Sequence, residues 1–404
     1  MARKWQSVRS RRAGPLIGGV LSLAVAMGIG RFAYTPLLPA MQRSLHWSVG
    51  FSGLVASANY VGYLVGALVA GALPVTARWS RLSWVVVGLF GVSLSVGAMG
   101  FGTHAAWWLI GRGLAGIFSA WVLVFTSSLL LDWFAAHGDT RSPAQLYAGV
   151  GLGIVLTGIV GPWLSGLGGW HTGWIGLGVG SLVLSGVTVR LLRPVTTPPP
   201  PAAVKRPPSS HADPSPRLWG LVVAYGLEGL GYVIMATFIT TFFGAGAQAI
   251  GNISWILVGL AAVPSTVVWA GLARRWGSRT ALSAAFGVEA LGVVLPVLGA
   301  NAAASLVGAV LFGGTFMGIT AQGLAIAGEA APASSHRIMG RMTAAFGLGQ
   351  LIGPLGVAGL AGHPHGLTVS LLSSAGLLGG AGVLFGATYR PPSAMRSSKR
   401  RTVG

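Results

Sequence analysis

Four ionisable side chains lie inside long apolar runs of this chain, where a charge is costly and usually marks a functional position. Two are cations, Arg31 and Arg112, and two are acids, Glu228 and Glu289. A buried guanidinium can attract an anionic substrate, and a buried carboxyl group can take up and release a proton. The four side chains therefore indicate anion binding and proton exchange inside an apolar chain.

Each of these residues also has a structural interpretation. Arg31 lies about two-thirds of the way along the first apolar run, so it either attracts an anion or a carboxylate, or snorkels to the outer interface. Glu228 lies near the middle of the seventh run and is either a proton-coupling site or a structural partner for a cation or backbone group. Arg112 either pairs with a carboxylate or ties two helices together.

Neutral polar and aromatic side chains in the same runs are candidates for substrate contact. Asn59 and Tyr63 are four residues apart and share one helix face. Inter-helix hydrogen bonds are the alternative role, worth about 0.6 kcal/mol each on average. The candidates are Tyr34, Asn59, Tyr60, Tyr63, Tyr232, Gln322 and Gln350.

Two Gly-Pro pairs, Gly161-Pro162 and Gly353-Pro354, occupy matching places in the two halves of the chain. A proline inside a helix removes one backbone hydrogen bond and bends the helix. We expect a role in conformational change, and close helix packing is the alternative.

The elements that position these residues are apolar helices. Of the 404 residues, 53% are hydrophobic and 8% are charged, whereas soluble domains carry about 25% charged residues. A helix needs about 20 apolar residues to span a bilayer. The sequence predicts twelve such spans, at 15–40, 51–73, 82–101, 105–131, 143–167, 171–193, 217–243, 252–272, 279–299, 302–328, 338–360 and 366–388.

Basic residues predict the orientation of these spans. Of 26 Lys and Arg residues, Arg31 and Arg112 lie inside spans, Arg43 lies in an outer loop, and the other 23 lie in alternate connections and at both termini. Because cytoplasmic loops are enriched in Lys and Arg, we expect a multi-pass protein of the bacterial inner membrane with both termini cytoplasmic. This orientation explains the net charge of +20, which therefore does not indicate nucleic-acid binding.

A Pro-rich, basic stretch at 194–216 divides the chain. Such composition is typical of a linker. We therefore expect an all-α membrane protein of twelve transmembrane helices in two pseudo-symmetric six-helix bundles. The bundles are 1–193 and 217–404, joined by a cytoplasmic linker at 194–216.

Several function classes lack support in the sequence. The chain has no cysteine, no phosphate-binding loop and no paired metal-ligand motif. We therefore expect no enzyme activity, no metal and no cofactor. The expected partners are the lipid bilayer, a small-molecule substrate and protons, and the expected state is a monomer.

Several segments resemble the major facilitator superfamily in their order along the chain. ARRWGSR (273–279) resembles its basic loop motif, although Arg274 replaces the Asp of that motif. WLIGRGLAGIFSAW (108–121) is similar to the fourth-span motif, and TGIVGPWLSG (157–166) is similar to the fifth-span motif of antiporters. GIGRFAYTPLLPAM (28–41) resembles the first-span signature of the YbfB/YjiJ branch.

The resemblance assigns places to the candidate residues. It implies that spans one, four, seven and ten line a central cavity, which would place Arg31, Arg112 and Glu228 near it. It implies a coupling role for Arg112 and a peripheral ninth span for Glu289, whose expected state is a neutral or paired acid. Near the cytoplasmic ends, conformational roles would fall to Arg274, Arg275, Glu329 and Arg337; the alternative is a solvated basic face.

The resulting hypothesis is a secondary active transporter that works by alternating access. The buried cations favour an anionic or drug-like organic solute, and the carboxyl group at Glu228 favours proton coupling. Export is favoured over uptake by the antiporter-like fifth span. The alternatives are an uncoupled uniporter and a non-transporting receptor or scaffold on the same fold.

Overall fold

The computed structural model describes residues 2–72, 79–139, 142–195, 218–242, 247–299, 301–330 and 335–390. The predicted linker at 194–216 lies almost entirely outside the described residues, so its boundaries stay a prediction. All secondary structure in the described ranges is helical. Twelve helical segments are long and apolar enough to span a membrane, at the places predicted from the sequence.

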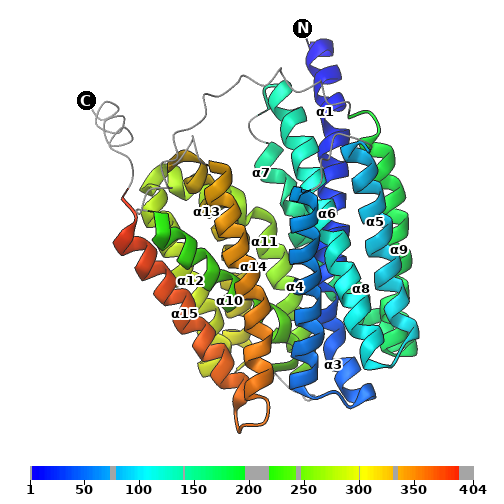
Figure 1. The fold of residues 1–404 in the computed structure, drawn as a ribbon, viewed down its shortest axis with the longest axis vertical. Helices are drawn as coiled ribbons and strands as arrows, with labels where there is room; N and C mark the ends of the chain where they lie inside the picture. The colour runs from blue at the N-terminus through cyan, green and yellow to red at the C-terminus, as the bar shows by residue number, and fades with distance from the viewer. Residues whose placement is uncertain are drawn as a thin grey trace.

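The helices are named in chain order (Figure 1). The first span combines α1 (Ala2–Leu23), the π-helix η1 (Ala24–Ile29), α2 (Gly30–Phe32) and α3 (Tyr34–Leu45). The rest of the first half is α4 (Val49–Ala72), α5 (Arg81–Ala98), η2 (Met99–Phe101), α6 (Ala105–Ala136), α7 (Ser142–Leu146), α8 (Ala148–Gly168) and α9 (Trp170–Leu192). The second half is α10 (Trp219–Phe242), α11 (Gln248–Trp276), α12 (Ser278–Gly299), α13 (Ala302–Ala330), α14 (Ser335–Leu360) and α15 (Gly366–Thr388).

The spans form two six-helix bundles that lie side by side, with the start of α1 and the end of α15 at the same end of the molecule (Figure 1). The two bundles meet mainly through α4 against α14 and α8 against α11. In span numbers, the second span packs against the eleventh and the fifth against the eighth. In each contact, the second span of one half therefore meets the fifth span of the other half. This is the pattern of a pseudo-twofold arrangement and confirms the predicted fold class.

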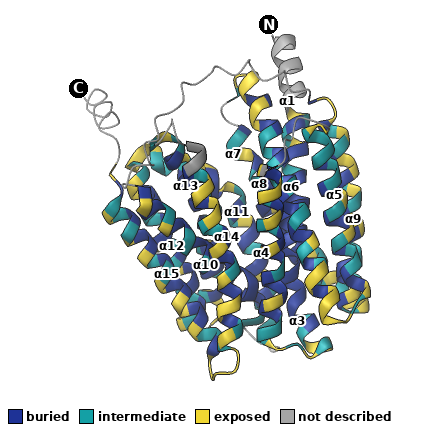
Figure 2. Ribbon diagram, viewed as in Figure 1, coloured by how far each residue is buried: buried dark blue, intermediate teal, exposed yellow. Residues whose placement is uncertain are grey.

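The first and seventh spans occupy the interior. In their most apolar windows, 78% and 72% of residues are buried, against 33–50% in the other ten spans. The other ten spans instead expose large apolar side chains such as Trp163, Val183 and Val383, and the buried residues concentrate along the centre (Figure 2). Apolar side chains on an outer surface suit a surface covered by lipid. The two central spans carry Arg31 and Glu228.

The first span is longer than the sequence predicts. It runs from Ala13 to Leu45 rather than from 15 to 40, so Arg31 lies near its middle and not two-thirds along it. A π-helix, a rare conformation that often occurs at functional sites, directly precedes α2. At this level Gly28 packs against the backbone of Gly153 on α8, where a Cβ at either position would clash.

Candidate functional site

Arg31 lies at the centre of the molecule with only 3% of its surface exposed. Its Nη2 donates a hydrogen bond to the hydroxyl of Tyr232 on α10, at 3.1 Å. This bond joins the first span to the seventh and therefore one bundle to the other. Arg31 does not snorkel to an interface in this structure, because its span continues for more than three turns beyond it.

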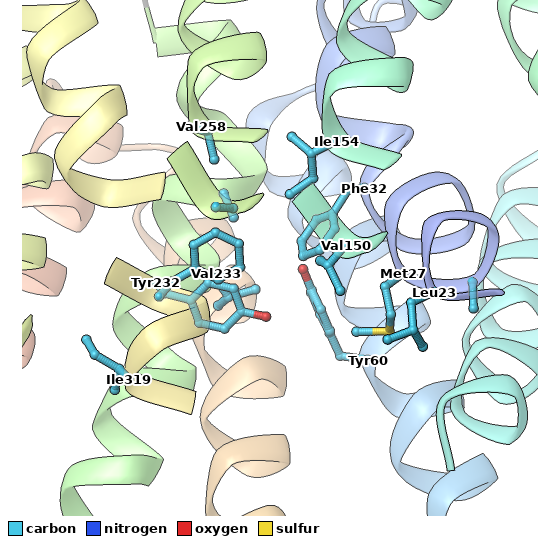
Figure 3. Packing of buried hydrophobic residues seen from close by; sticks show 14 of the residues in the cluster. Leu23, Met27, Phe32, Tyr60, Val150, Ile154, Tyr232, Val233, Val258 and Ile319 are labelled. Carbon is cyan, nitrogen blue, oxygen red and sulfur yellow. The ribbon is translucent and has the colours of Figure 1, made fainter. Parts of the chain in front are cut away.

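Aromatic rings surround the Arg31 guanidinium. Its Cζ lies 4.8 Å from the ring centroids of both Tyr60 and Tyr63 on α4, and 5.6 Å from that of Phe32. Rings at such distances stabilise a cation through their negative faces. Tyr60 and Tyr232 point toward one another from the two halves (Figure 3). No carboxylate among the described residues lies within salt-bridge distance of Arg31, and its Nε has no hydrogen-bond partner among them.

Arg112 on α6 holds the backbone that carries Arg31. Its Nη1 and Nη2 donate to the carbonyl oxygens of Gly30 and Arg31, each at 3.0 Å. The Arg112 carbonyl in turn accepts from Asn59 Nδ2 at 2.9 Å, and its guanidinium lies over the Tyr34 ring at 5.2 Å. These contacts correspond to the helix-tether interpretation. Arg112 has no carboxylate within salt-bridge distance in the described part of the chain.

The predicted glutamines occupy different environments. Gln350 on α14 donates from Nε2 to the Tyr232 hydroxyl, so it belongs to the Arg31 cluster. Gln322 on α13 is buried. Within the described residues, neither amide atom of Gln322 has a hydrogen-bond partner, and Gln350 Oε1 has none either. Tyr34, also predicted to touch substrate, donates its hydroxyl to the Ser52 carbonyl at 2.9 Å.

Glu228 and Glu289 are both fully buried and lie in hydrogen-bonding contact with each other. They reach this contact from α10 and α12, the seventh and ninth spans, near the middle of each. Tyr232 lies within electrostatic reach of both Glu228 and Arg31. The sequence does not predict that the two acids meet, because nothing in their separation along the chain signals it.

Hydrogen bonds between the halves also occur toward the end of the molecule opposite the start of α1 and the end of α15. Thr35 Oγ1 donates to the Ala236 carbonyl at 2.7 Å, and Thr240 Oγ1 donates to the Thr35 carbonyl at 2.5 Å. Near the end of α3, Arg43 donates to Gln248 at the start of α11, at 3.2 Å. Sequence reasoning missed both threonines, since a threonine in an apolar span carries no distinguishing signal.

Both Gly-Pro pairs lie where the bundles approach each other. The Pro354 carbonyl packs against Gly53 of α4, which belongs to the other half. Pro162 lines a groove together with Arg43 of α3 and Gln248 of α11. Gly353 packs tightly on Val233 and the Leu230 carbonyl, whereas Gly161 leaves room for a Cβ.

The predicted residues near the end of the molecule where α1 starts and α15 ends are mostly solvent-facing. Arg274, Arg275 and Glu329 are exposed, and the side chain of Arg337 lies outside the described residues. A partly exposed ion pair joins Arg81 Nη1 and Asp132 Oδ2 at 2.5 Å. Burial raises the pKa of Tyr389, which follows α15, and the nearby charge of Glu329 acts in the same direction.

Two pseudo-symmetric bundles of six spans, with polar side chains gathered between them, define a facilitator-type membrane transporter. Two solved structures share this fold. A mutant form of the nucleoside transporter NupG superimposes with a TM-score of 0.70 at 14% identity, covering 93% of this chain and 100% of that one. An inward-facing, occupied bacterial homologue of the human lysosomal transporter Spinster gives a TM-score of 0.68 at 14% identity, with 93% and 96% coverage.

Residues 23–387 match the family model described as uncharacterised MFS-type transporter YbfB, and the chain belongs to that family. The chain is also similar to the MFS-type transporter YceJ of Bacillus subtilis (strain 168), at 30% identity over 171 residues. That alignment covers 40% of this chain and 41% of the relative. The match confirms the resemblance drawn from the first-span signature and the loop motifs.

Proposed function

We propose that this protein is a proton-coupled secondary transporter for a small organic anion, with export favoured over uptake. It would act as a monomer in the bacterial inner membrane with both termini in the cytoplasm. The family and fold establish a membrane transporter, and the substrate, the coupling and the direction are the proposed parts. A carboxylate-bearing or drug-like solute is the favoured cargo.

The observation that carries the proposal is the state of Arg31. It is a cation at mid-span, buried between the two bundles, with aromatic faces and one phenolic hydroxyl around it and no carboxylate partner in the described residues. A buried charge is costly unless it is paired. An anionic substrate would supply the missing negative charge, and this pairing would make substrate binding at that depth more favourable.

The neighbouring polar atoms indicate what else such a solute carries. Gln350 Oε1 and Asn59 Oδ1 are buried acceptors without partners in the described part of the chain. They would accept hydrogen bonds from hydroxyl or amino groups of a solute. The faces of Tyr60 and Tyr63 add aromatic surface beside the cation. We therefore favour a small carboxylate that also carries a hydrogen-bond donor.

Alternating access would require the contacts between the bundles to break and re-form on opposite sides of Arg31. The Thr35–Ala236 and Thr240–Thr35 hydrogen bonds would open when the site faces outward. The Gly161-Pro162 and Gly353-Pro354 segments would bend during this movement. Arg274, Arg275, Glu329 and Arg337 would contribute on the cytoplasmic side.

Uptake into proteoliposomes tests the proposed substrate class. Full-length protein would be assayed with a panel of small carboxylates, each paired with its neutral amide, under an imposed pH gradient. We expect transport of at least one carboxylate and not of its amide, reduced in Arg31→Lys and lost in Arg31→Ala. Arg190→Ala, which removes an exposed arginine at the end of α9, is the matched control. Normal carboxylate transport by Arg31→Ala would contradict the proposal.

A further inference from the structure

The contact between Glu228 and Glu289 is chemically unusual. Both side chains have 0% exposed surface, and the two carboxyl groups lie in hydrogen-bonding contact. They lie at the middle of α10 and α12, and Thr315, near the middle of α13, lies next to Glu289. Thus two of the six acidic side chains in the sequence meet at the same depth of the membrane.

A hydrogen bond between two carboxyl groups requires a proton. An ionised carboxylate only accepts hydrogen bonds, whereas a protonated carboxyl group also donates one. Apart from Thr315, whose hydroxyl lies within hydrogen-bonding reach of Glu289, no N–H or hydroxyl group of the described residues donates to either carboxyl group. Two ionised carboxylates in contact would repel each other at a buried site. The contact is therefore satisfied by one proton held between the two groups.

No basic side chain of the described residues neutralises this pair. The pair lies on α10 and α12, and the helices packed mainly against these two are α11, α13, α14 and α15. Among the described side chains of these six helices, the other ionisable groups are Tyr225, Tyr232, Arg274, Arg275, Arg279, Glu329 and Arg341. The four arginines and Glu329 are exposed. The negative charge of the pair can therefore be reduced only by proton uptake.

Tyr232 connects the acid pair to the proposed anion site. Its hydroxyl accepts from Arg31 at 3.1 Å, and Glu228 acts on the same tyrosine electrostatically. The Tyr232 ring stacks on Phe316 and Phe346, at centroid distances of 5.8 and 5.5 Å. The proton site and the anion site are therefore made of different residues and share Tyr232 as a neighbour.

We propose that Glu228 and Glu289 form a single proton-binding site, a carboxylic acid–carboxylate pair that holds one shared proton, linked to Arg31 through Tyr232. This inference rests on the proposed function and deepens it, since it replaces a single coupling acid with a pair. In the exchange step the O–H bond of the protonated carboxyl group breaks, the proton passes to water, and the pair changes from one negative charge to two.

A metal cation is the other ligand that two carboxyl groups suggest. Hard cations take about six or more oxygen ligands. This site offers the two carboxyl groups and the hydroxyl of Thr315, which already donates within its own helix. No cluster of three or more His, Cys, Asp or Glu side chains occurs in the described part of the chain. The geometry therefore favours a proton, and sodium becomes an outcome of the test.

Infrared spectroscopy of the full-length protein in liposomes tests the pair directly, because a protonated carboxyl group has its own carbonyl stretching band. With six acidic side chains in the whole sequence, the band can be assigned by substitution. We expect a protonated-carboxyl band at neutral pH that shifts in both Glu228→Gln and Glu289→Gln and disappears in the double variant. Glu329→Gln, which changes an exposed acid on α13, should leave it unchanged.

Three spectroscopic results would overturn the inference. They are a band unaffected by Glu289→Gln, the absence of any protonated-carboxyl band, and removal of the band by sodium at constant pH. The first needs a folded variant, confirmed by an unchanged gel-filtration profile; the other two need only the wild-type protein. Transport separates this inference from the proposed function. Proton-driven transport that survives Glu289→Gln but not Glu228→Gln would reject the pair and retain proton coupling. A shared-proton band in a protein that never moves protons would retain the pair and reject proton coupling.

Discussion

Replacing Tyr232 with phenylalanine removes one oxygen atom from the centre of the molecule. That oxygen accepts a hydrogen bond from Arg31 Nη2 at 3.1 Å and another from Gln350 Nε2. Phenylalanine keeps the ring and so keeps the stacking on Phe316 and Phe346. The substitution therefore isolates the hydroxyl group, and it leaves two buried donors on different helices without an acceptor.

The expected cost follows from those two donors. A hydrogen bond to a charged group contributes about 1.5–3 kcal/mol, and an inter-helix hydrogen bond in a membrane averages about 0.6 kcal/mol. We therefore expect Tyr232→Phe to lower the free energy of unfolding by about 2–3.5 kcal/mol. The Arg31 guanidinium would also lose the contact that joins it to the second bundle.

Tyr225→Phe is a matched control on the same helix. Tyr225 is also buried, packs against Phe346 with its ring tilted and lies about two turns from Tyr232. Its hydroxyl donates to one backbone carbonyl, that of Thr320, at 3.2 Å. Its removal should cost only about 0.6 kcal/mol. Thermal unfolding of the purified proteins in one detergent compares the two variants, and equal losses would refute the central place of the Tyr232 hydroxyl.

Three further substitutions test other parts of the structure, the first two by the same unfolding measurement. Gly62→Ala should destabilise the protein strongly, because a Cβ there would meet the backbone of Gly113. The control Gly186→Ala places a Cβ in open space and should be neutral or stabilising by up to about 1 kcal/mol. Equal effects of the two substitutions would contradict the close approach of α4 and α6. Asp132→Asn removes the partly exposed ion pair with Arg81 and should change stability by no more than about 1 kcal/mol; a larger loss would mean that the pair is shielded from water. Thr35→Val removes the hydroxyl that donates to the Ala236 carbonyl at 2.7 Å and should weaken the contact between the bundles. The measurement is the labelling rate of a cysteine introduced at Thr240, which should increase. An unchanged labelling rate would contradict the role of Thr35 in that contact.

Much of the architecture can be predicted because bilayer physics constrains it strongly. The length of apolar runs predicts the spans, and the two halves share Gly-Pro segments whose positions match in the fold. The end of the first span is the exception. Pro36 and Pro39 lie within it, and proline usually ends or bends a helix, yet the helix continues to Leu45.

The site is predictable in its members but not in its pairings. Arg31 and Tyr232 are 201 positions apart, and only the packing of the two bundles brings them together. The resemblance places Glu289 on a peripheral span, but a glutamate side chain is long enough to reach inward to Glu228. One interpretation of Arg112 pairs it with a carboxylate, but its guanidinium donates to backbone carbonyl oxygens. Composition shows which polar groups are buried, whereas tertiary packing decides their partners.

Proton movement during transport is the most direct test of the proposed mechanism. A carboxylate identified from the uptake panel would be added to proteoliposomes that contain a pH-sensitive dye, with wild-type protein or Glu228→Gln. We expect the internal pH to change with the wild-type protein, and no change with Glu228→Gln, which should still exchange labelled for unlabelled substrate. Full proton-driven accumulation by Glu228→Gln would contradict the assignment of proton coupling to Glu228.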